Sequence, residues 1–217
     1  MTKRVSEPVQ IPHDTILFIS GAPGAGKTSI SYGILRRFDC FRIIEETDIM
    51  REIIRGYNAF AADYCRDERI SEINMYDSTV IMSYSEALNQ CRIIKNSIRN
   101  VVERQQRKKI PTIINGVHIV PKELIRTITS TSTVYINLYV SDFEILKKRL
   151  SLRNEEKYSM SNIGKIYEMN RKLEHSTREV AKEHPKHVFN IDTSFLEENR
   201  IVDMIKDTLA DNNTANI

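Results

Sequence analysis

The sequence predicts an α/β protein in which a mostly parallel β-sheet is covered by helices on both faces. Short apolar runs typical of buried strands alternate along the chain with segments whose apolar residues recur at helical spacing. A glycine-rich turn separates the first of these strands from the first helix. The length of 217 residues fits a single domain with a small insertion and leaves little room for two full domains.

The first half of the chain contains two expected strands and three expected helices. Residues 15–20 form an apolar run of the kind found in buried parallel strands, and 41–44 form a second, shorter one. Apolar residues three and four positions apart predict helices over 27–38 and from 48 to about 56. The same spacing continues over 78–109, which predicts one long helix with a basic end.

The second half of the chain continues the alternation. Strands are expected at 111–114, 133–140 and 187–191, with a further amphipathic helix over about 161–183. These five expected strands and the helices between them imply parallel pairing, because parallel strands require crossover connections.

Two more helix starts are expected from capping-box spacing, in which a serine is followed three residues later by a glutamate. Ser141 and Glu144 predict the start of the helix after the fourth strand. Ser194 and Glu197 predict the start of the last helix.

Composition excludes several classes of protein. Hydrophobic residues make up 41% of the chain and charged residues 28%, which is ordinary for a globular protein and argues against global disorder. The net charge of +3 does not indicate nucleic-acid binding. The apolar runs are too short to span a bilayer, and the start of the chain lacks the apolar region of a secretory signal. No membrane partner is therefore expected. Three cysteines without zinc or disulfide spacing favour a cytoplasmic location.

The strongest functional signal is the segment GAPGAGKT at residues 21–28, which matches the phosphate-binding pattern GxxxxGK[ST]. It lies between an expected strand and an expected helix, where backbone N–H groups and the helix dipole favour a bound phosphate. Lys27 is expected to reach the β- and γ-phosphates of ATP, and Thr28 to ligate Mg²⁺. The residues expected to bind the nucleotide are Gly21, Ala22, Pro23, Gly24, Ala25, Gly26, Lys27, Thr28 and Ser29.

The rest of the sequence favours a small-molecule kinase among proteins with this motif. There is no NKxD-type guanine motif, and no apolar strand ends in the Asp-Glu pair typical of motor ATPases. Asp48 follows the second strand, where an acid is able to orient an acceptor hydroxyl and accept its proton. A helix-start acid favoured by the dipole is the other interpretation of Asp48. Arg51 and Arg55 share its helix face and are either ligands for an anionic acceptor or surface ion-pair partners.

Further candidates lie at the end of the third strand and after the fourth. Asn115 and His118 follow the third strand, at the edge of the sheet where ligands bind in such folds. Arg149 and Arg153 precede the polar segment 151–164, which we interpret as a lid that brings arginines over the phosphoryl group. Asn115 and His118 are therefore assigned to acceptor binding, and the two arginines, with Lys27 and Asp48, to catalysis.

Several segments together resemble the 2-phosphoglycerate kinase family of small-molecule P-loop kinases. These segments are GAPGAGKTS, ETDIMREIIR, SYSEA, IINGVHIVP and VYINLYVSDFEILKKRL, and the resemblance covers about residues 15–192. It implies a P-loop NTPase three-layer sandwich, a five-stranded parallel sheet of order 2-3-1-4-5, a helical lid, and 2-phosphoglycerate as the first candidate acceptor. Asn115 stands where the family usually has a carboxylate, and a neutral amide cannot act as a base.

The expected organisation is an N-terminal arm over 1–13, one kinase domain over 14–210, and a flexible tail over 211–217. The expected activity is phosphoryl transfer from ATP to a hydroxyl of a small, anionic metabolite. Two alternatives remain open: a kinase that modifies an antibiotic, a nucleoside or a polynucleotide end, and a nucleotide-dependent switch with little phosphotransfer. The sequence leaves the oligomeric state open.

Overall fold

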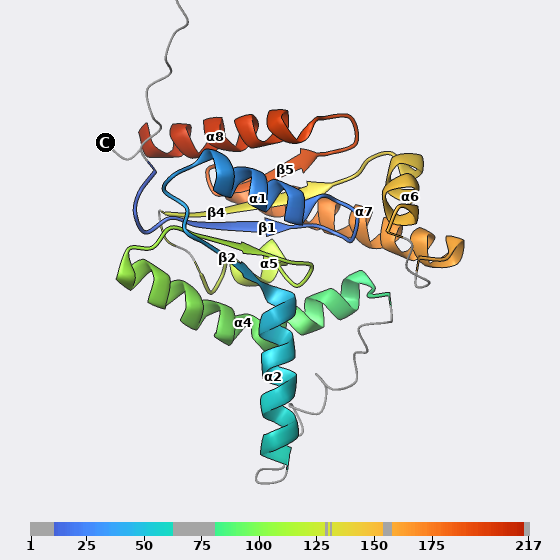
Figure 1. Ribbon diagram of the computed structural model, residues 1–217, viewed down its shortest axis with the longest axis horizontal. Helices are drawn as coiled ribbons and strands as arrows, with labels where there is room; N and C mark the ends of the chain where they lie inside the picture. The colour runs from blue at the N-terminus through green and yellow to red at the C-terminus, as the bar shows by residue number, and fades with distance from the viewer. Residues whose placement is uncertain (1–10, 63–80, 129, 131, 154–157, 215–217) are drawn as a thin grey trace, which may run out of the picture.

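The computed structural model describes residues 11–62, 81–128, 130, 132–153 and 158–214 (Figure 1). The strands are β1 (Ile16–Ser20), β2 (Ile43–Glu46), β3 (Thr112–Asn115), β4 (Thr133–Tyr139) and β5 (Val188–Asp192). The helices are α1 (Lys27–Arg37), α2 (Thr47–Ala62), α4 (Tyr84–Lys108), α5 (Pro121–Leu124), α6 (Phe143–Ser151), α7 (Met160–Glu183) and α8 (Glu198–Thr214). In this part of the chain, no helix is long and apolar enough to cross a membrane.

All five strands are parallel and lie in the order β2-β3-β1-β4-β5, which confirms the expected sheet. Asn115 at the end of β3 is in register with Ile19 of β1 and Glu46 of β2. The carboxyl ends of β2, β3 and β1 therefore meet at one edge of the sheet. Ligands of open parallel sheets bind at this edge, outside the ends of the strands.

Helices cover both faces of the sheet, so the molecule is the expected three-layer sandwich. Leu17 and Ile19 of β1 pack on one face with residues of α1 and α8, whereas Ile16 and Phe18 pack on the other face with residues of α4. Figure 1 shows α1 and α8 on one side of the sheet and α4 and α5 on the other. Alternate side chains of β1 therefore serve two separate cores, because successive side chains in a strand point to opposite faces.

Several boundaries differ from the expected ones. The helix that starts after β2 continues through Gly56 to Ala62, and α5 was not expected. The helix α7 begins at Met160, so it takes the last residues of the segment 151–164 that was interpreted as a lid. Residues 154–157 of that segment lie outside the described part of the chain.

At both ends of the described chain, residues assigned from the sequence to an arm or a tail belong to the folded domain. Ile11, near the end of the expected arm, is buried in the core cluster that contains Phe38 and Phe41. At the other end α8 continues to Thr214, so the helix includes the first four residues of the expected tail, 211–217. Residues 1–10 and 215–217 lie outside the described residues.

Both capping boxes expected from the sequence are wrong. Asp142, not Ser141, is the N-cap of α6, and its carboxylate accepts hydrogen bonds from the backbone N–H groups of Glu144 and Ile145 at 2.8 and 3.1 Å. Ser194 lies before the start of α8 and bonds elsewhere, which leaves its spacing with Glu197 without a capping role. A complete capping box does occur at Ser83 and Glu86, at the start of α4.

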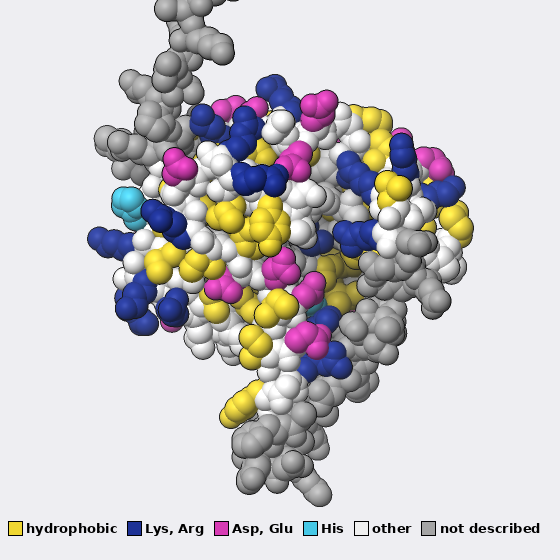
Figure 2. Space-filling model, in the orientation of Figure 1, with side chains coloured by type: hydrophobic (Ala, Val, Ile, Leu, Met, Phe, Trp, Pro, Cys, Tyr) yellow, Lys and Arg dark blue, Asp and Glu magenta, His cyan; other side chains and the backbone are white. Residues whose placement is uncertain are grey.

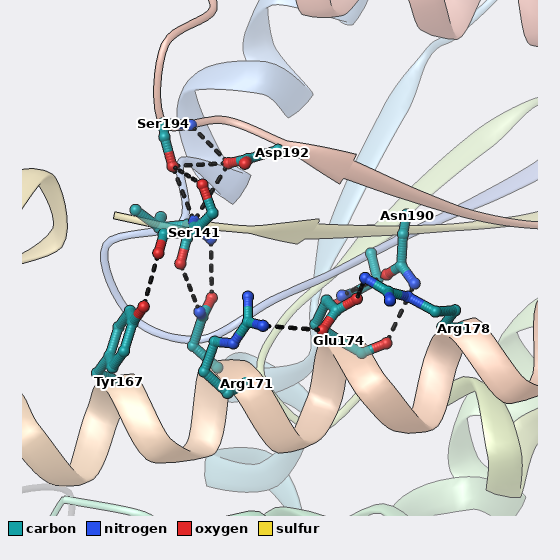
Figure 3. A network of polar contacts seen from close by, with 11 residues as sticks. Ser141, Tyr167, Arg171, Glu174, Arg178, Asn190, Asp192 and Ser194 are labelled. Carbon is teal, nitrogen blue, oxygen red and sulfur yellow. Dashed lines mark hydrogen bonds and ion pairs between the residues drawn. The ribbon is translucent and has the colours of Figure 1, made fainter. Parts of the chain in front are cut away.

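Ser141 and Ser194 instead belong to a polar network that joins the ends of β4 and β5 to α7 (Figure 3). The Asp192 carboxylate accepts from the backbone N–H and the hydroxyl of Ser194, and the Ser194 hydroxyl accepts from the Ser141 N–H at 2.8 Å. Tyr167 of α7 donates to the Ser141 carbonyl at 2.6 Å, and Asn170 bonds both backbone groups of Val140. This network holds α7, the helix after the expected lid, against the end of β4, the strand before the expected lid.

Candidate active site

The P-loop leads from β1 into α1 and has the backbone shape that its glycines permit. Gly26 is the N-cap of α1 and has φ 93°, a left-handed conformation that glycine adopts without strain. A Cβ at Gly26 would meet no atom within 4 Å, so the loop is open on that side. Thr28 and Ser29, in the first turn of α1, are exposed. An open loop at a helix N-terminus, where backbone N–H groups point outward, fits a bound phosphate group.

Lys27 folds back onto this loop. Its ammonium group donates to the carbonyl oxygens of Gly21 at 2.8 Å and Ala22 at 3.1 Å. Burial lowers the pKa of Lys27 to about 8, while the Asp48 carboxylate acts in the opposite direction and the Arg153 guanidinium adds to the decrease. Lys27, Asp48 and Arg153 come from three distant parts of the sequence, and their mutual electrostatic influence shows that the fold brings them together.

Asp48 lies in the first turn of α2, directly after the end of β2. Its side chain is 59% exposed, so the carboxylate is accessible from solvent. The carboxylate oxygen Oδ1 lies 3.4 Å from Nδ1 of His118, and the same ring nitrogen lies 3.1 Å from the hydroxyl of Thr47. The histidine that follows β3 therefore contacts the first two residues of α2.

His118 itself is completely buried. Burial lowers its pKa to about 4, an effect to which Arg51 and Lys27 add and which Asp48 opposes. The ring is therefore neutral at neutral pH and carries one N–H. Its second nitrogen, Nε2, is buried and has no hydrogen-bond partner among the described residues. A neutral ring that donates from Nδ1 suits a carboxylate such as Asp48, because a carboxylate only accepts hydrogen bonds.

Asn115 is buried at the end of β3, and its amide nitrogen donates to the hydroxyl of Ser31 at 3.0 Å. Ser31 is on the second turn of α1, one turn after Lys27. Sequence reasoning did not identify Ser31, because no local pattern marks a serine that faces the sheet. The Asn115 amide nitrogen thus ties the strand to the helix that carries the P-loop lysine.

The two arginines of α2 are engaged with the same glutamate. Arg51 contacts Glu52 at 2.8 Å, and Arg55 contacts it at 3.1 Å. The Arg51 side chain is only 11% exposed and lies inward, whereas that of Glu52 is 48% exposed. The ion-pair interpretation from the sequence therefore describes both arginines, although Arg51 is much more buried than a surface partner.

Arg149, near the end of α6, is held beside the P-loop. Its guanidinium donates to the hydroxyl of Thr193 at 2.9 Å, to the carbonyl of Thr193, and to the carbonyl of Gly24 at 3.4 Å. Partial burial lowers its pKa from the ordinary value, and Asp192 opposes this effect. Thr193 is buried and also donates to the carbonyl of Ala25 at 3.1 Å. Sequence reasoning missed Thr193, which links the P-loop to Arg149 and to the end of β5.

Arg153, four residues later, is exposed and donates to the hydroxyl of Tyr158 at 3.3 Å. It lines a pocket of about 340 Å³ beside the P-loop, together with Gly26, Ser29, Arg149 and Thr193. Figure 2 shows lysine and arginine side chains around α6. Over the rest of this face, basic side chains are interleaved with acidic and apolar ones. The pocket is next to the open side of the loop, where a nucleotide bound by the loop would continue.

Two other arginines in the second half of the chain, Arg171 and Arg178, lie on α7 and do not line this pocket. Both form ion pairs with Glu174, whose side chain is 3% exposed (Figure 3). Within the described residues, no group of three His, Cys, Asp or Glu side chains is placed to hold a metal ion. Thr28 remains the residue whose hydroxyl would hold Mg²⁺.

Two comparisons by sequence bear on this site. A family model described as Zeta toxin matches residues 2–109, a segment that includes the P-loop, β2, α2 and α4. The mevalonate-3-phosphate 5-kinase of Thermoplasma acidophilum is 29% identical over 141 residues, which is 64% of this chain and 67% of that protein. The 2-phosphoglycerate kinase of Methanopyrus kandleri is 28% identical over 199 residues, which is 87% of this chain, and the chain spans 58% of that protein's length.

A comparison by structure extends over nearly the whole chain. A shikimate kinase from Acinetobacter baumannii, solved in complex with shikimate, superposes with a TM-score of 0.53 at 12% identity. The alignment covers 94% of this chain and 96% of that one. At this level of identity the likeness is one of fold, and it agrees with the strand order and the layers described above.

Proposed function

We propose that this chain is a small-molecule P-loop kinase, which uses ATP to phosphorylate a hydroxyl of a small, anionic metabolite resembling 2-phosphoglycerate. Both relatives similar in sequence are named for phosphorylated acceptors, mevalonate 3-phosphate and 2-phosphoglycerate. Arg51, which is one turn after Asp48 on α2 and has a side chain only 11% exposed, supports an anionic substrate despite its ion pair with Glu52.

The observation that carries this proposal is the position of Asp48. Its carboxylate is accessible, acts electrostatically on Lys27 of the P-loop, and is in contact with the neutral ring of His118. A carboxylate opposite the phosphate-binding lysine is suited to orient an acceptor hydroxyl and to take its proton. Nδ1 of the neutral His118 ring lies 3.4 Å from the carboxylate, so the ring does not compete with the acceptor as a charged partner of Asp48.

On the nucleotide side, Lys27 and the backbone N–H groups of the P-loop would bind the phosphates of ATP. Mg²⁺, held by Thr28, would neutralise charge on the β- and γ-phosphates. Arg149 and Arg153 line the pocket beside the loop, and Arg153 is the more exposed of the two. The chain's own contribution is positioning together with charge complementarity, which dominates catalysis in phosphoryl transfer.

A metabolite-library screen tests the proposal. The full chain, ATP and Mg²⁺ are incubated with candidate acceptors, and mass spectrometry detects the gain of one phosphoryl group. Asp48→Asn should lower kcat by about 10²–10⁴-fold while ATP affinity stays nearly constant. Glu45→Gln, at an acid three residues earlier on β2, is the matched control and should keep its activity.

The same screen separates the kinase from the alternatives. A nucleotide-dependent switch would bind ATP and yield no phosphorylated product with any acceptor. Selective phosphorylation of an antibiotic, a nucleoside or a polynucleotide end would replace the anionic metabolite as the substrate. A collapse of ATP affinity in Asp48→Asn with kcat largely retained would move Asp48 to the nucleotide side and refute its role as the base.

A further inference from the structure

A row of polar side chains crosses three strands of the sheet close to their carboxyl ends. Ser20 of β1, Asn137 of β4 and Asn190 of β5 are in register with one another. The Ser20 hydroxyl donates to Oδ1 of Asn137 at 2.9 Å, and Nδ2 of Asn137 donates to Oδ1 of Asn190 at 2.8 Å. Nδ2 of Asn190 donates in turn to the backbone carbonyl of Glu174 at 3.1 Å (Figure 3). The row therefore runs without a break from β1 to α7.

This polar row replaces an apolar layer that the sheet could have continued. Two residues earlier on the same face of the three strands stand Phe18, Tyr135 and Val188, which are buried together. Ser20 and Asn137 are equally buried, and burying polar groups costs free energy that apolar side chains would not cost. Hydrogen bonds are directional, however, so a connected row fixes the relative positions of the strands more narrowly than apolar contacts do.

Each of the three strands leads into a part of the proposed nucleotide site. Ser20 is followed by Gly21, the first residue of the P-loop, whose carbonyl accepts from the Lys27 ammonium group at 2.8 Å. The strand β4 leads into α6, which carries Arg149, and the residue directly after β5, Thr193, accepts a hydrogen bond from Arg149. The row thus joins the strands that place the lysine of the loop and the arginine beside it.

The start of the P-loop fits tightly against β4 next to this row. A Cβ on Gly21 would lie 2.4 Å from the carbonyl oxygen of Leu138, the residue after Asn137, and φ of Gly21 is 148°. Glycine therefore lets the loop leave the sheet this close to β4. A shift of Ser20 relative to Asn137 would either separate the loop from β4 or press its first residue into that strand.

We propose that Asn137 is a positioning residue of the nucleotide site. Through its hydrogen bonds to Ser20 and Asn190, it keeps the P-loop in place relative to the arginine of α6, and it touches neither nucleotide nor acceptor itself. The inference rests on the proposed function, because ATP bound by the loop is part of that function. Nucleotide binding, more than folding, should depend on the row, since a misplacement of about 1 Å is costly at such a site.

A variant with an apolar row separates positioning from stability. Ser20→Ala, Asn137→Val and Asn190→Val together remove every polar side-chain atom of the row, and valine suits a strand. The Glu174 carbonyl lies within α7 and keeps its place in the helix. Because no member of the row is left without a partner, the Tm should stay within about 4 °C of the wild-type value. Asn137→Val alone strands both neighbours and should lower the Tm by about 4 °C or more.

The decisive measurement is calorimetry with the non-hydrolysable ATP analogue AMP-PNP and Mg²⁺. The apolar-row variant should raise the Kd by about tenfold or more, which corresponds to about one lost hydrogen bond to a phosphate. Tyr135→Phe is the matched control, since it removes a polar atom on the same face of β4, one layer further from the P-loop. Its hydroxyl donates to the Ile128 carbonyl at 2.7 Å, so this variant should lower the Tm and leave the Kd unchanged.

Two results would overturn the inference and leave the proposed kinase intact. One is a wild-type Kd in the apolar-row variant, and the other is a Kd that rises as much in Tyr135→Phe, because affinity would then follow stability. If the triple variant does not fold, Ser20→Ala alone should raise the Kd by about threefold or more, and an unchanged Kd overturns the inference. Absence of AMP-PNP binding by the wild type would refute the proposed function, and the inference with it.

Discussion

Gly116 and Thr47 approach so closely that a Cβ on Gly116 would lie 1.7 Å from the Thr47 hydroxyl oxygen. Gly116 follows β3 and has φ 153°, while Thr47 is the first residue of α2 and hydrogen-bonds His118. The backbone at the end of β3 therefore packs directly against the Thr47 side chain at the start of α2. This contact sets the distance between His118 and Asp48, because each is one or two residues from the pair.

Gly116→Ala should therefore displace the start of α2. We expect the free energy of unfolding to fall by about 2–4 kcal/mol, since the methyl group meets a backbone-anchored side chain and the backbone conformation is unfavourable for alanine. Chemical denaturation measures this loss. Gly56→Ala is the control: no atom lies within 4 Å of its Cβ position on α2, and alanine there should stabilise the helix by about 0.5–1 kcal/mol. Equal stability of the two variants would contradict the close contact.

Lys27 should take up a proton when a nucleotide binds. Its pKa of about 8 in the free protein is low because burial disfavours the charged ammonium. Anionic phosphates favour the charged form and raise this pKa, so binding between about pH 8 and 10 shifts Lys27 from neutral to charged. Calorimetry of nucleotide binding at pH 8.5 in buffers of different ionisation enthalpy should report this uptake in the wild type.

Lys27→Met provides the comparison for that titration. It should bind the nucleotide without proton uptake and should lower the catalytic rate by about 10²-fold or more, because a cation at the phosphates is lost. Proton uptake of the same size in Lys27→Met would assign the proton to another group. Near-normal turnover by a folded Lys27→Met would rule out this loop as the catalytic site.

His118 should make the protein sensitive to mild acid. Burial lowers its pKa to about 4 in the folded protein, below its ordinary value of about 6.5, so the unfolded chain binds more protons between these values. The free energy of unfolding should therefore fall as the pH falls from about 6.5 to 4, by up to about 3 kcal/mol. Urea unfolding at a series of pH values measures this slope.

His118→Gln should flatten the slope over that pH range, because the titrating group is removed. His175→Gln, at an exposed histidine of α7, should leave the slope as it is in the wild type. The same slope in His118→Gln and wild type would assign the acid sensitivity to other groups, the carboxylates first among them.

Arg149 and Arg153 should respond differently to substitution by lysine. Arg149→Lys loses the fork that joins Thr193 to the Gly24 carbonyl, so it should weaken ATP binding and lower the Tm. Arg153→Lys should lower kcat by about tenfold or more with little change in ATP affinity, since Arg153 is exposed and its charge acts on Lys27. Steady-state kinetics with ATP titrations separates the two. Arg107→Lys, in the last turn of α4, is the control and should change neither kcat nor ATP affinity. An Arg153→Lys variant with unchanged kinetics would remove Arg153 from catalysis.

Much of the fold follows from local patterns in the sequence. The P-loop, its strand and its helix are recognisable because glycine spacing and the flanking apolar runs are contiguous. The strand order was expected from the resemblance to the 2-phosphoglycerate kinase family, and a 2-phosphoglycerate kinase is among the relatives, at 28% identity. The expected caps at Ser141 and Ser194 were wrong because Asp192 and the end of β4 offer these serines other partners, and spacing within one segment does not report contacts with another.

The parts of the candidate site that sequence reasoning missed share one property. Ser31 and Thr193 have ordinary neighbours in the sequence, and each is notable only for what it faces in the fold. Ser31 faces a residue 84 positions later, and Thr193 bonds Ala25, which is 168 positions earlier.

The strand order also governs how this protein is made on the ribosome. Residues 2–109, which match the Zeta toxin model, contain β1 and β2, yet these strands do not pair with each other, because β3 lies between them. Strand pairing in the described sheet therefore begins only after Thr112–Asn115 has been translated. Until then the apolar β1 of the nascent chain has no neighbouring strand, a state that is prone to aggregation. The yield of folded protein should therefore depend on the rate of synthesis and on chaperone binding before residue 112 is translated.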